Sequence, residues 1–207
     1  MFLVCGFEPF GGMRRNPSGE AAQAVAAQAI QALDGVEAAV LPVDYGRLGP
    51  ALDTLLARPW RGVLLLGVRD PKQLLWADPH RSVFAVERVA INYRNPGRPD
   101  NTGAAPTELE LVPGGPAAYF ATLDPLLLVA RLKQEGLPAQ ASLSAGAYLC
   151  NASFYLALAA LRPRGVPCIF VHVPPTPDMG VKGASLEFEE LCRGVRVALD
   201  HVKAVST

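Results

Sequence analysis

The chain has 207 residues, half of them hydrophobic, so it is long enough to bury a substantial core within one domain spanning residues 1–207. Nineteen basic side chains balance nineteen acidic ones, and the sequence has no block of lysine and arginine, which argues against nucleic acid and anionic membranes as partners. The apolar runs are too short to span a bilayer and the N-terminal run has no basic flank, so we expect a cytoplasmic protein without a signal peptide.

The first part of the chain alternates predicted strands and helices. Residues 2–6 are an apolar run that ends at a glycine, which predicts a buried strand. An Ala-rich helix is expected to extend to about Leu33, with Ser18 as its N-cap and Glu20 in its first turn. The elements expected next are a strand at 36–42, a helix at 48–57 and a fully apolar strand at 62–67.

This alternation predicts an α/β fold in which helices cover both faces of a mostly parallel sheet. Sites in such sheets form beyond the carboxyl ends of the strands, so the loops after Gly6, Gly67 and Ser144 are expected to meet. The first of these loops carries two aromatic residues, Phe7 and Phe10. They are either a satellite of the core or the walls of an apolar pocket.

In the second part of the chain, a strand is expected at residues 83–92. An irregular segment rich in Pro, Gly, Asn and Asp follows at about 93–116, and loops of this length are often lids or binding loops. The remaining predicted elements are helices at 125–134, 151–161 and 185–202 and strands at 139–144 and 167–175.

Glu87 stands in the middle of the strand expected at 83–92. Alternation places it on the same face as Ala85, Val89 and Ile91, among apolar neighbours. Because burying an unpaired charge is costly, its carboxylate needs a partner inside the protein. An ion pair with an arginine would meet this need without any catalytic role.

Cys150 is expected where a strand and turn lead into the start of a helix. Unpaired N–H groups and the positive end of the helix dipole stabilise a thiolate there, and the thiolate is the reactive form. The alternative is a buried structural thiol, which is what most free cysteines are. The other cysteines, Cys5, Cys168 and Cys192, are scattered without zinc-binding spacing, so no structural metal and no disulfide is expected.

His172 lies near the carboxyl end of the strand at 167–175, on the opposite face from its apolar neighbours. A histidine in such a strand is either a hydrogen-bonded core residue or a catalyst, whereas His80 and His201 are expected at the surface. Cys150, His172 and Glu87 are together a chemically suitable set for nucleophilic catalysis, with a thiolate, an imidazole that activates it and a carboxylate that orients the imidazole.

Five groups of residues, in this order, carry a resemblance to a known family. They are GFEPFGG at 6–12 with NPS at 16–18, LPV at 41–43, ERVAIN at 87–92 with Asp100 and Asn101, SAGAYLCN at 144–151 with Tyr155, and VHVP at 171–174. Along nearly its whole length the chain resembles pyroglutamyl peptidase I, also called pyrrolidone-carboxylate peptidase.

The resemblance implies a single-domain three-layer α/β/α sandwich and a cysteine peptidase without a cofactor. It implies hydrolysis of the amide after an N-terminal pyroglutamyl residue of peptides, usually by a homotetramer. Carried onto this chain, the implied Cys–His–Glu triad is Cys150, His172 and Glu87. The implied substrate-binding residues are Phe7, Phe10, Asn16, Val68 and Arg98, with the two phenylalanines holding the lactam ring.

Two departures from the family pattern leave alternatives open. The family usually has Gly-Gln-Ala where this chain has Gly67-Val68-Arg69, and Arg-Ile where it has Gly97-Arg98. A one-residue shift of an arginine in an extended segment reverses its direction, so its contribution to the oxyanion site is open. The alternatives are a catalytically silent relative that binds a small ligand or partner, and an amidase or thioesterase with an altered pocket.

Overall fold

A computed structural model describes residues 1–31, 35–68, 83–180 and 185–206. Its centre is a six-stranded sheet. The strands lie in the order β2 (Val36–Leu41), β1 (Phe2–Phe7), β3 (Gly62–Val68), β8 (Cys168–Val173), β4 (Phe84–Glu87) and β7 (Ala139–Ser142). Neighbouring strands are parallel except for β8 and β4, which are antiparallel, so the expected mostly parallel sheet is confirmed.

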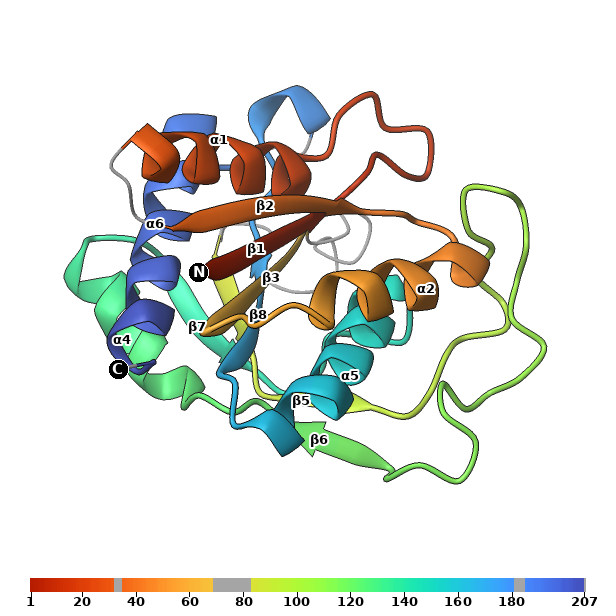
Figure 1. The fold of residues 1–207 in the computed structure, drawn as a ribbon. Helices are drawn as coiled ribbons and strands as arrows, with labels where there is room; N and C mark the ends of the chain where they lie inside the picture. The colour runs from red at the N-terminus through yellow and green to blue at the C-terminus, as the bar shows by residue number, and fades with distance from the viewer. Residues whose placement is uncertain (32–34, 69–82, 181–184, 207) are drawn as a thin grey trace.

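Helices cover both faces of this sheet (Figure 1). One face packs against α1 (Pro17–Gln31), α4 (Pro125–Gln134) and α6 (Phe188–Ala204), and the other against α2 (Tyr45–Leu56) and α5 (Leu149–Leu161). Every residue of β3 is buried, as expected for a central strand with helices on both sides. The predicted three-layer α/β/α sandwich is confirmed, and short 3₁₀ helices at η1 (Arg162–Arg164) and η2 (Pro177–Met179) complete it.

The prediction of a single strand at residues 83–92 is wrong. The chain leaves the central sheet after Glu87 and forms β5 (Val89–Ile91), which pairs antiparallel with β6 (Ala118–Phe120) in a separate two-stranded sheet. Alternation therefore fails across Arg88, because Phe84 packs in the cluster below α1 and α6 whereas Ala90 packs with α5. The partner β6 was not predicted because it is short, largely exposed and preceded by a segment rich in proline and glycine.

The first helix begins two residues earlier than expected. Asn16, not Ser18, takes the capping position: its Oδ1 accepts hydrogen bonds from the Ser18 amide at 3.1 Å and the Ser18 hydroxyl at 2.8 Å. Pro17 fills the first helical position, where its missing N–H costs nothing. The Ser18 hydroxyl instead accepts from the Phe7 amide and ties the helix to the end of β1. The helix end expected at Leu33 lies outside the described residues.

His201 is buried, contrary to the expectation that it lies at the surface. It shares the inner face of α6 with Val195, Ala198 and Val202, at helical spacing, and is 8% exposed. Burial lowers its pKa, and the nearby Arg131 acts in the same direction. His80 lies outside the described residues.

The loops after Gly6, Gly67 and Ser144 meet as expected, because Phe10, Val68 and Tyr148 line one pocket, but the reason expected for the third loop is wrong. The carboxyl ends of β1 and β3 lie at the same edge, as predicted, but β7 runs in the opposite direction because it is parallel to β4. The chain after Ser142 therefore has to return along residues 143–148 before it enters α5.

Among the described residues, no helix is long and apolar enough to cross a membrane.

Candidate active site

Glu87 and His172 meet across the antiparallel pair of strands β4 and β8. In this register Ala85 faces His172, and Glu87 lies two residues further along the same face. Diagonal neighbours of this kind are within reach of long side chains. The His172 Nδ1 and Glu87 Oε1 atoms are 2.7 Å apart, and Glu87 is only 1% exposed. The partner of the buried carboxylate is thus a histidine and not the arginine considered from the sequence.

Cys150 is the second residue of α5, so its position at a helix start is confirmed. Its Sγ lies close to Gly67 of β3: a Cβ added at that glycine would stand 2.9 Å from the sulfur and 3.2 Å from the His172 Cδ2. The sulfur and the imidazole therefore both lie against the backbone of Gly67, in space that a side chain at this position would occupy. The Cys150 side chain lies close enough to His172 to raise the pKa of the imidazole.

The imidazole of His172 stands between two groups that can carry negative charge. Its burial lowers the pKa, but hydrogen bonds and charge interactions with Cys150 and Glu87 outweigh burial and raise the pKa of His172 to about 9. The cationic form is therefore favoured at neutral pH. Within the described part of the chain, the other carboxylate oxygen of Glu87 is buried and has no hydrogen-bond partner. The carboxylate is thus held to the imidazole through one oxygen.

All four cysteines are free, and they differ sharply in exposure. Cys5 and Cys168 are fully buried, and this burial raises the pKa of the Cys5 thiol to about 12 and that of Cys168 as well. Burial also raises the pKa of Cys192. Because the thiolate is the nucleophilic form, these three are unreactive, whereas Cys150 is partly exposed at a pocket.

An apolar pocket opens beside the Cys150 sulfur. It is lined by Phe7, Phe10, Asn16, Val43, Val68, Tyr148 and Leu149 together with Cys150. Four of the five substrate-binding residues expected from the sequence line this pocket. Val43, Tyr148 and Leu149 were missed as lining residues, although Tyr148 and Leu149 directly precede Cys150 in the sequence and Val43 belongs to one of the matching segments.

Arg98 is the fifth expected residue and stands against the pocket wall. Its guanidinium carbon lies 4.2 Å from the centre of the Tyr148 ring and 5.9 Å from that of Phe10. These are cation–π distances, and both rings line the pocket. Arg98 therefore holds the aromatic wall in place, a contact that the sequence did not predict.

The irregular segment expected at 93–116 packs around the same pocket. The Asn101 Nδ2 donates to the Pro9 carbonyl oxygen at 2.8 Å, and the Tyr148 hydroxyl donates to the Pro99 carbonyl oxygen at 3.1 Å. Glu8 joins the third side, because its carboxylate accepts from the Val43 amide at 2.9 Å. The loop after β1, the loop after β2 and the long segment are thus hydrogen-bonded to one another around the pocket.

Comparison with known proteins places the chain. The sequence model of a family described as pyroglutamyl peptidase matches residues 1–205. The chain belongs to the pyroglutamyl peptidase family. This is a family of cysteine peptidases, in agreement with a partly exposed thiol in contact with an imidazole.

Individual members of the pyroglutamyl peptidase family agree with this assignment. The pyrrolidone-carboxylate peptidase of Gloeobacter violaceus is 36% identical over 98% of this chain and 96% of its own length, and that of Chromobacterium violaceum is 39% identical over 96% and 90%. The crystal structure of pyrrolidone carboxyl peptidase from Thermus thermophilus superposes with a TM-score of 0.84 at 39% identity, covering 97% of this chain and 100% of that one.

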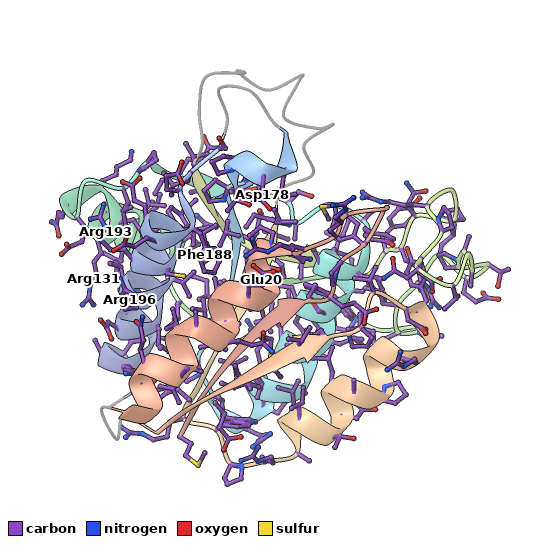
Figure 2. All side chains as sticks on the ribbon, turned by 90° about the horizontal axis from the view of Figure 1, so that it is seen from above. Glu20, Arg131, Asp178, Phe188, Arg193 and Arg196 are labelled. Atoms are coloured by element: carbon purple, nitrogen blue, oxygen red, sulfur yellow. The ribbon has the colours of Figure 1, made fainter. Side chains whose placement is uncertain are left out.

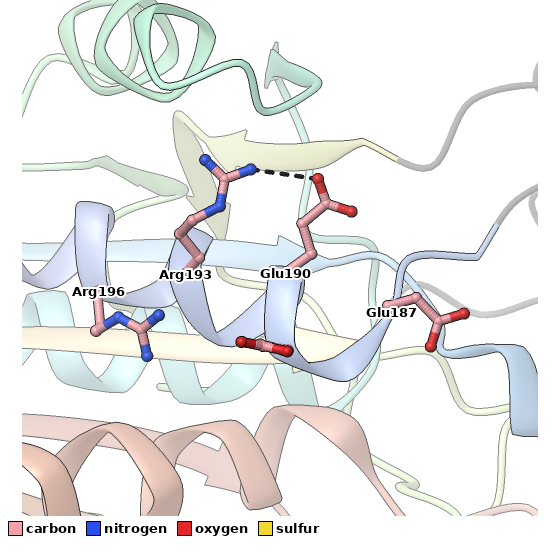
Figure 3. A pocket seen from close by; sticks show the side chains of 5 residues that line it. Glu187, Glu190, Arg193 and Arg196 are labelled. Atoms are coloured by element: carbon pink, nitrogen blue, oxygen red, sulfur yellow. Dashed lines mark hydrogen bonds and ion pairs between the residues drawn. The ribbon is translucent and has the colours of Figure 1, made fainter.

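A second depression lies on the surface of α6, in the helical layer on the other side of the sheet from α5. It is lined by Glu187, Glu189, Glu190, Arg193 and Arg196, and Figure 3 shows the ion pair between Arg193 and Glu190, at 3.2 Å. Figure 2 shows Arg131, Arg193 and Arg196 pointing outward from α4 and α6. This depression is charged and open. Its lining contains no nucleophile, whereas the apolar pocket of this pyroglutamyl peptidase family member contains Cys150. Within the described residues, no cluster of His, Cys, Asp and Glu side chains could hold a metal ion.

Proposed function

We propose that the protein is a cysteine exopeptidase that hydrolyses the amide bond after an N-terminal pyroglutamyl residue of peptides. The observation that carries this proposal is the contact of one imidazole with both a buried carboxylate and a partly exposed thiol beside an aromatic pocket. Family membership supports the same reaction.

In the proposed mechanism, Cys150 is the nucleophile. With His172 cationic, the sulfur attacks the pyroglutamyl carbonyl carbon as a thiolate and forms a carbon–sulfur bond. His172 then donates its proton to the departing amine, so that the carbon–nitrogen bond breaks and a thioester remains. The neutral imidazole next takes a proton from water, whose oxygen attacks the thioester carbonyl carbon. The carbon–sulfur bond then breaks, pyroglutamate leaves, and the thiolate and the cationic imidazole are restored.

Glu87 is proposed to orient the imidazole. Its Oε1 accepts from Nδ1, which leaves Nε2 of the ring for the sulfur and the leaving group. Its charge also stabilises the imidazolium form, in agreement with the raised pKa of His172. A charge-assisted hydrogen bond in a buried position is stronger than a neutral one, and this suits a group that must be held through both steps.

The pocket is proposed to hold the lactam ring of the substrate. Pyroglutamate is neutral and has no free amine, so its site needs no carboxylate, and Phe7, Phe10 and Val68 present apolar surface. The Asn16 Nδ2 group has two hydrogens, and one of them bonds the Glu8 carbonyl oxygen. We assign the second to the lactam carbonyl. Arg98 is proposed to contribute to binding through the aromatic wall on which it stacks.

Three further features belong to this proposal. The whole chain, 1–207, acts as one peptidase domain with the irregular loop at 93–116 beside its pocket. The protein is cytoplasmic, in keeping with four free thiols. It assembles as a homotetramer, for which exposed apolar side chains such as Phe120, Leu127 and Leu143 provide contact surface. Light scattering of the purified protein tests the assembly.

The experiment that tests the reaction is the release of an arylamine from a pyroglutamyl arylamide. We expect turnover by the native protein, its loss in Cys150→Ala, and its retention in Cys192→Ala, a matched control that removes a thiol on the other side of the sheet. A prolyl arylamide, which has the five-membered ring without the lactam carbonyl, should be a poor substrate. If the native protein releases no product from any pyroglutamyl substrate, the proposal is wrong and a ligand-binding role takes its place.

A further inference from the structure

Asn151 directly follows Cys150 in the first turn of α5 and is completely buried. Its side-chain amide is bonded to the backbone of the segment around β5. The Oδ1 accepts from the Ile91 amide at 2.9 Å, and the Nδ2 donates to the carbonyl oxygens of Ile91 and Tyr93, each at 2.9 Å. One side chain thus makes three hydrogen bonds to the backbone of two residues, Ile91 and Tyr93, which are far from it in the sequence.

The strand β5 needs these bonds because one of its edges is open. It pairs with β6 through Arg88, whose carbonyl accepts from Ala121, and through Asn92, whose amide donates to Ala117. Alternate residues of a strand direct their peptide groups to opposite edges, so the groups of Ile91 face away from β6. In Figure 1, α5 and β5 lie side by side. The Asn151 amide therefore pairs with an edge that would otherwise be left with buried, unsatisfied groups.

This joint connects two parts of the site along the backbone. Asn151 is bonded covalently to Cys150, and β5 continues directly from the strand that carries Glu87. The start of that continuation is itself fixed, because the Arg88 amide donates to the Ser142 carbonyl at 2.8 Å. His172 contacts both Glu87 and Cys150. The amide thus fixes the helix that carries the thiol relative to the strand that carries the carboxylate.

We propose that Asn151 is a positioning residue for peptide hydrolysis, and that its amide sets the distance between the Cys150 sulfur and the imidazole of His172. It acts through its neighbour and does not touch the substrate. This inference rests on the proposed function. A displacement of a reacting group by about 1 Å can cost on the order of a hundredfold in rate. Loss of the three hydrogen bonds of Asn151 is therefore expected to lower turnover strongly.

The test compares Asn151→Ala with Tyr155→Phe. Tyr155 lies one helical turn further along α5, is also completely buried, and its hydroxyl donates to the Pro116 carbonyl at 2.7 Å. The control variant removes a buried hydrogen bond from the same helix without touching its first turn. Three measurements are made on each protein: the melting temperature, the steady-state kinetics (kcat and KM) on a pyroglutamyl arylamide, and the rate of Cys150 alkylation by iodoacetamide at pH 7.

We expect both variants to lose thermal stability but only Asn151→Ala to lose turnover. Its kcat should fall roughly ten- to hundredfold with KM within about threefold, because substrate binding in the pocket is not affected. Its rate of Cys150 alkylation at pH 7 should fall several-fold, because the displaced sulfur no longer lies beside the imidazole that activates it. Tyr155→Phe should keep the native kcat and the native rate of alkylation.

The proposal is overturned if the two variants lose kcat equally, or if Cys150 in Asn151→Ala is alkylated as fast as in the native protein. If the alanine variant does not fold, Asn151→Asp replaces it, since the carboxylate keeps the acceptor for Ile91 and loses both donors. The same two results then decide the outcome. Alkylation needs no peptide substrate, so an inactive native protein would refute the proposed function and leave the test of Asn151 intact.

Discussion

Replacement of Glu87 by glutamine tests the role of the buried carboxylate. The side chain keeps its shape but loses its charge, and its oxygen can still stand 2.7 Å from the His172 Nδ1. A hydrogen bond to a charged group contributes about 1.5–3 kcal/mol, against about 0.5–1.5 kcal/mol for a neutral pair. The change therefore removes on the order of 1–2 kcal/mol from the stabilisation of the imidazolium form. The carboxylate is 1% exposed, so solvent does not screen this loss.

This loss has two consequences that can be measured. One pH unit corresponds to about 1.4 kcal/mol, so the pKa of His172 in Glu87→Gln should fall by roughly one pH unit from its native value of about 9. The alkaline limb of the profile of kcat/KM against pH should move down by the same amount. At its optimum, kcat/KM should fall roughly 5- to 30-fold. The assay is hydrolysis of a pyroglutamyl arylamide across the pH range, with the melting temperature as the control for folding.

Stability should respond with the same sign. Folding raises the pKa of His172 from 6.5 to about 9, so this group stabilises the native state fully below pH 6.5 and loses that contribution as the pH rises through about 9. In Glu87→Gln the decline should begin at lower pH. An alkaline limb that does not move, together with an unchanged dependence of stability on pH, would refute the assignment of Glu87 as the group that holds the imidazolium.

Three further changes are expected to have distinct effects. Gly67→Ala should lower kcat/KM at least about tenfold in a folded protein. The added methyl group would stand 2.9 Å from the Cys150 sulfur and force the sulfur away from His172. Native activity in this variant would contradict the packing described at the site. Arg98→Ala should raise KM about two- to fivefold with kcat nearly unchanged, because a cation–π contact with Tyr148 is worth about 1 kcal/mol. Arg98→Lys should recover part of the lost affinity. A fall in kcat alone would instead assign Arg98 to stabilisation of the transition state. Iodoacetamide should modify Cys150 rapidly in the native protein and the other three thiols only after unfolding. Mass spectrometry of the labelled peptides measures this. Rapid labelling of a second thiol would contradict the burial of Cys5, Cys168 and Cys192.

Much of the fold could be read from local patterns. The apolar runs of β1, β3 and β8 and the helix at α4 follow directly from residue type and spacing, and α4 was predicted with its observed bounds, Pro125–Gln134. The failures lie where a distant partner overrides the local pattern. The strand expected at 83–92 divides because Arg88 bonds to β7 on one side and the backbone then turns to β6. A strand pattern does not reveal where its pairing partner changes.

The candidate site shows the same division. The sequence identified a thiol at a helix start, a histidine on the odd face of an apolar strand and a carboxylate among apolar neighbours, and the resemblance named four side chains that line the pocket. It assigned Arg98 to the substrate but could not show that the guanidinium stacks on Tyr148. It also gave no indication that Asn151 closes the edge of β5, because that contact joins residues far apart in the chain.

The sequence alone determined which residue types are available and which local backbone carries each one, because helix starts, buried strands and apolar faces depend on short-range spacing. Only the tertiary structure decided which groups meet. The reversed direction of β4 against β8 brings Glu87 diagonally to His172, and a bare glycine in β3 leaves room for the Cys150 sulfur beside the same ring. These distances depend on the register between strands and on the packing of α5 over the sheet, and neither is encoded in any single segment.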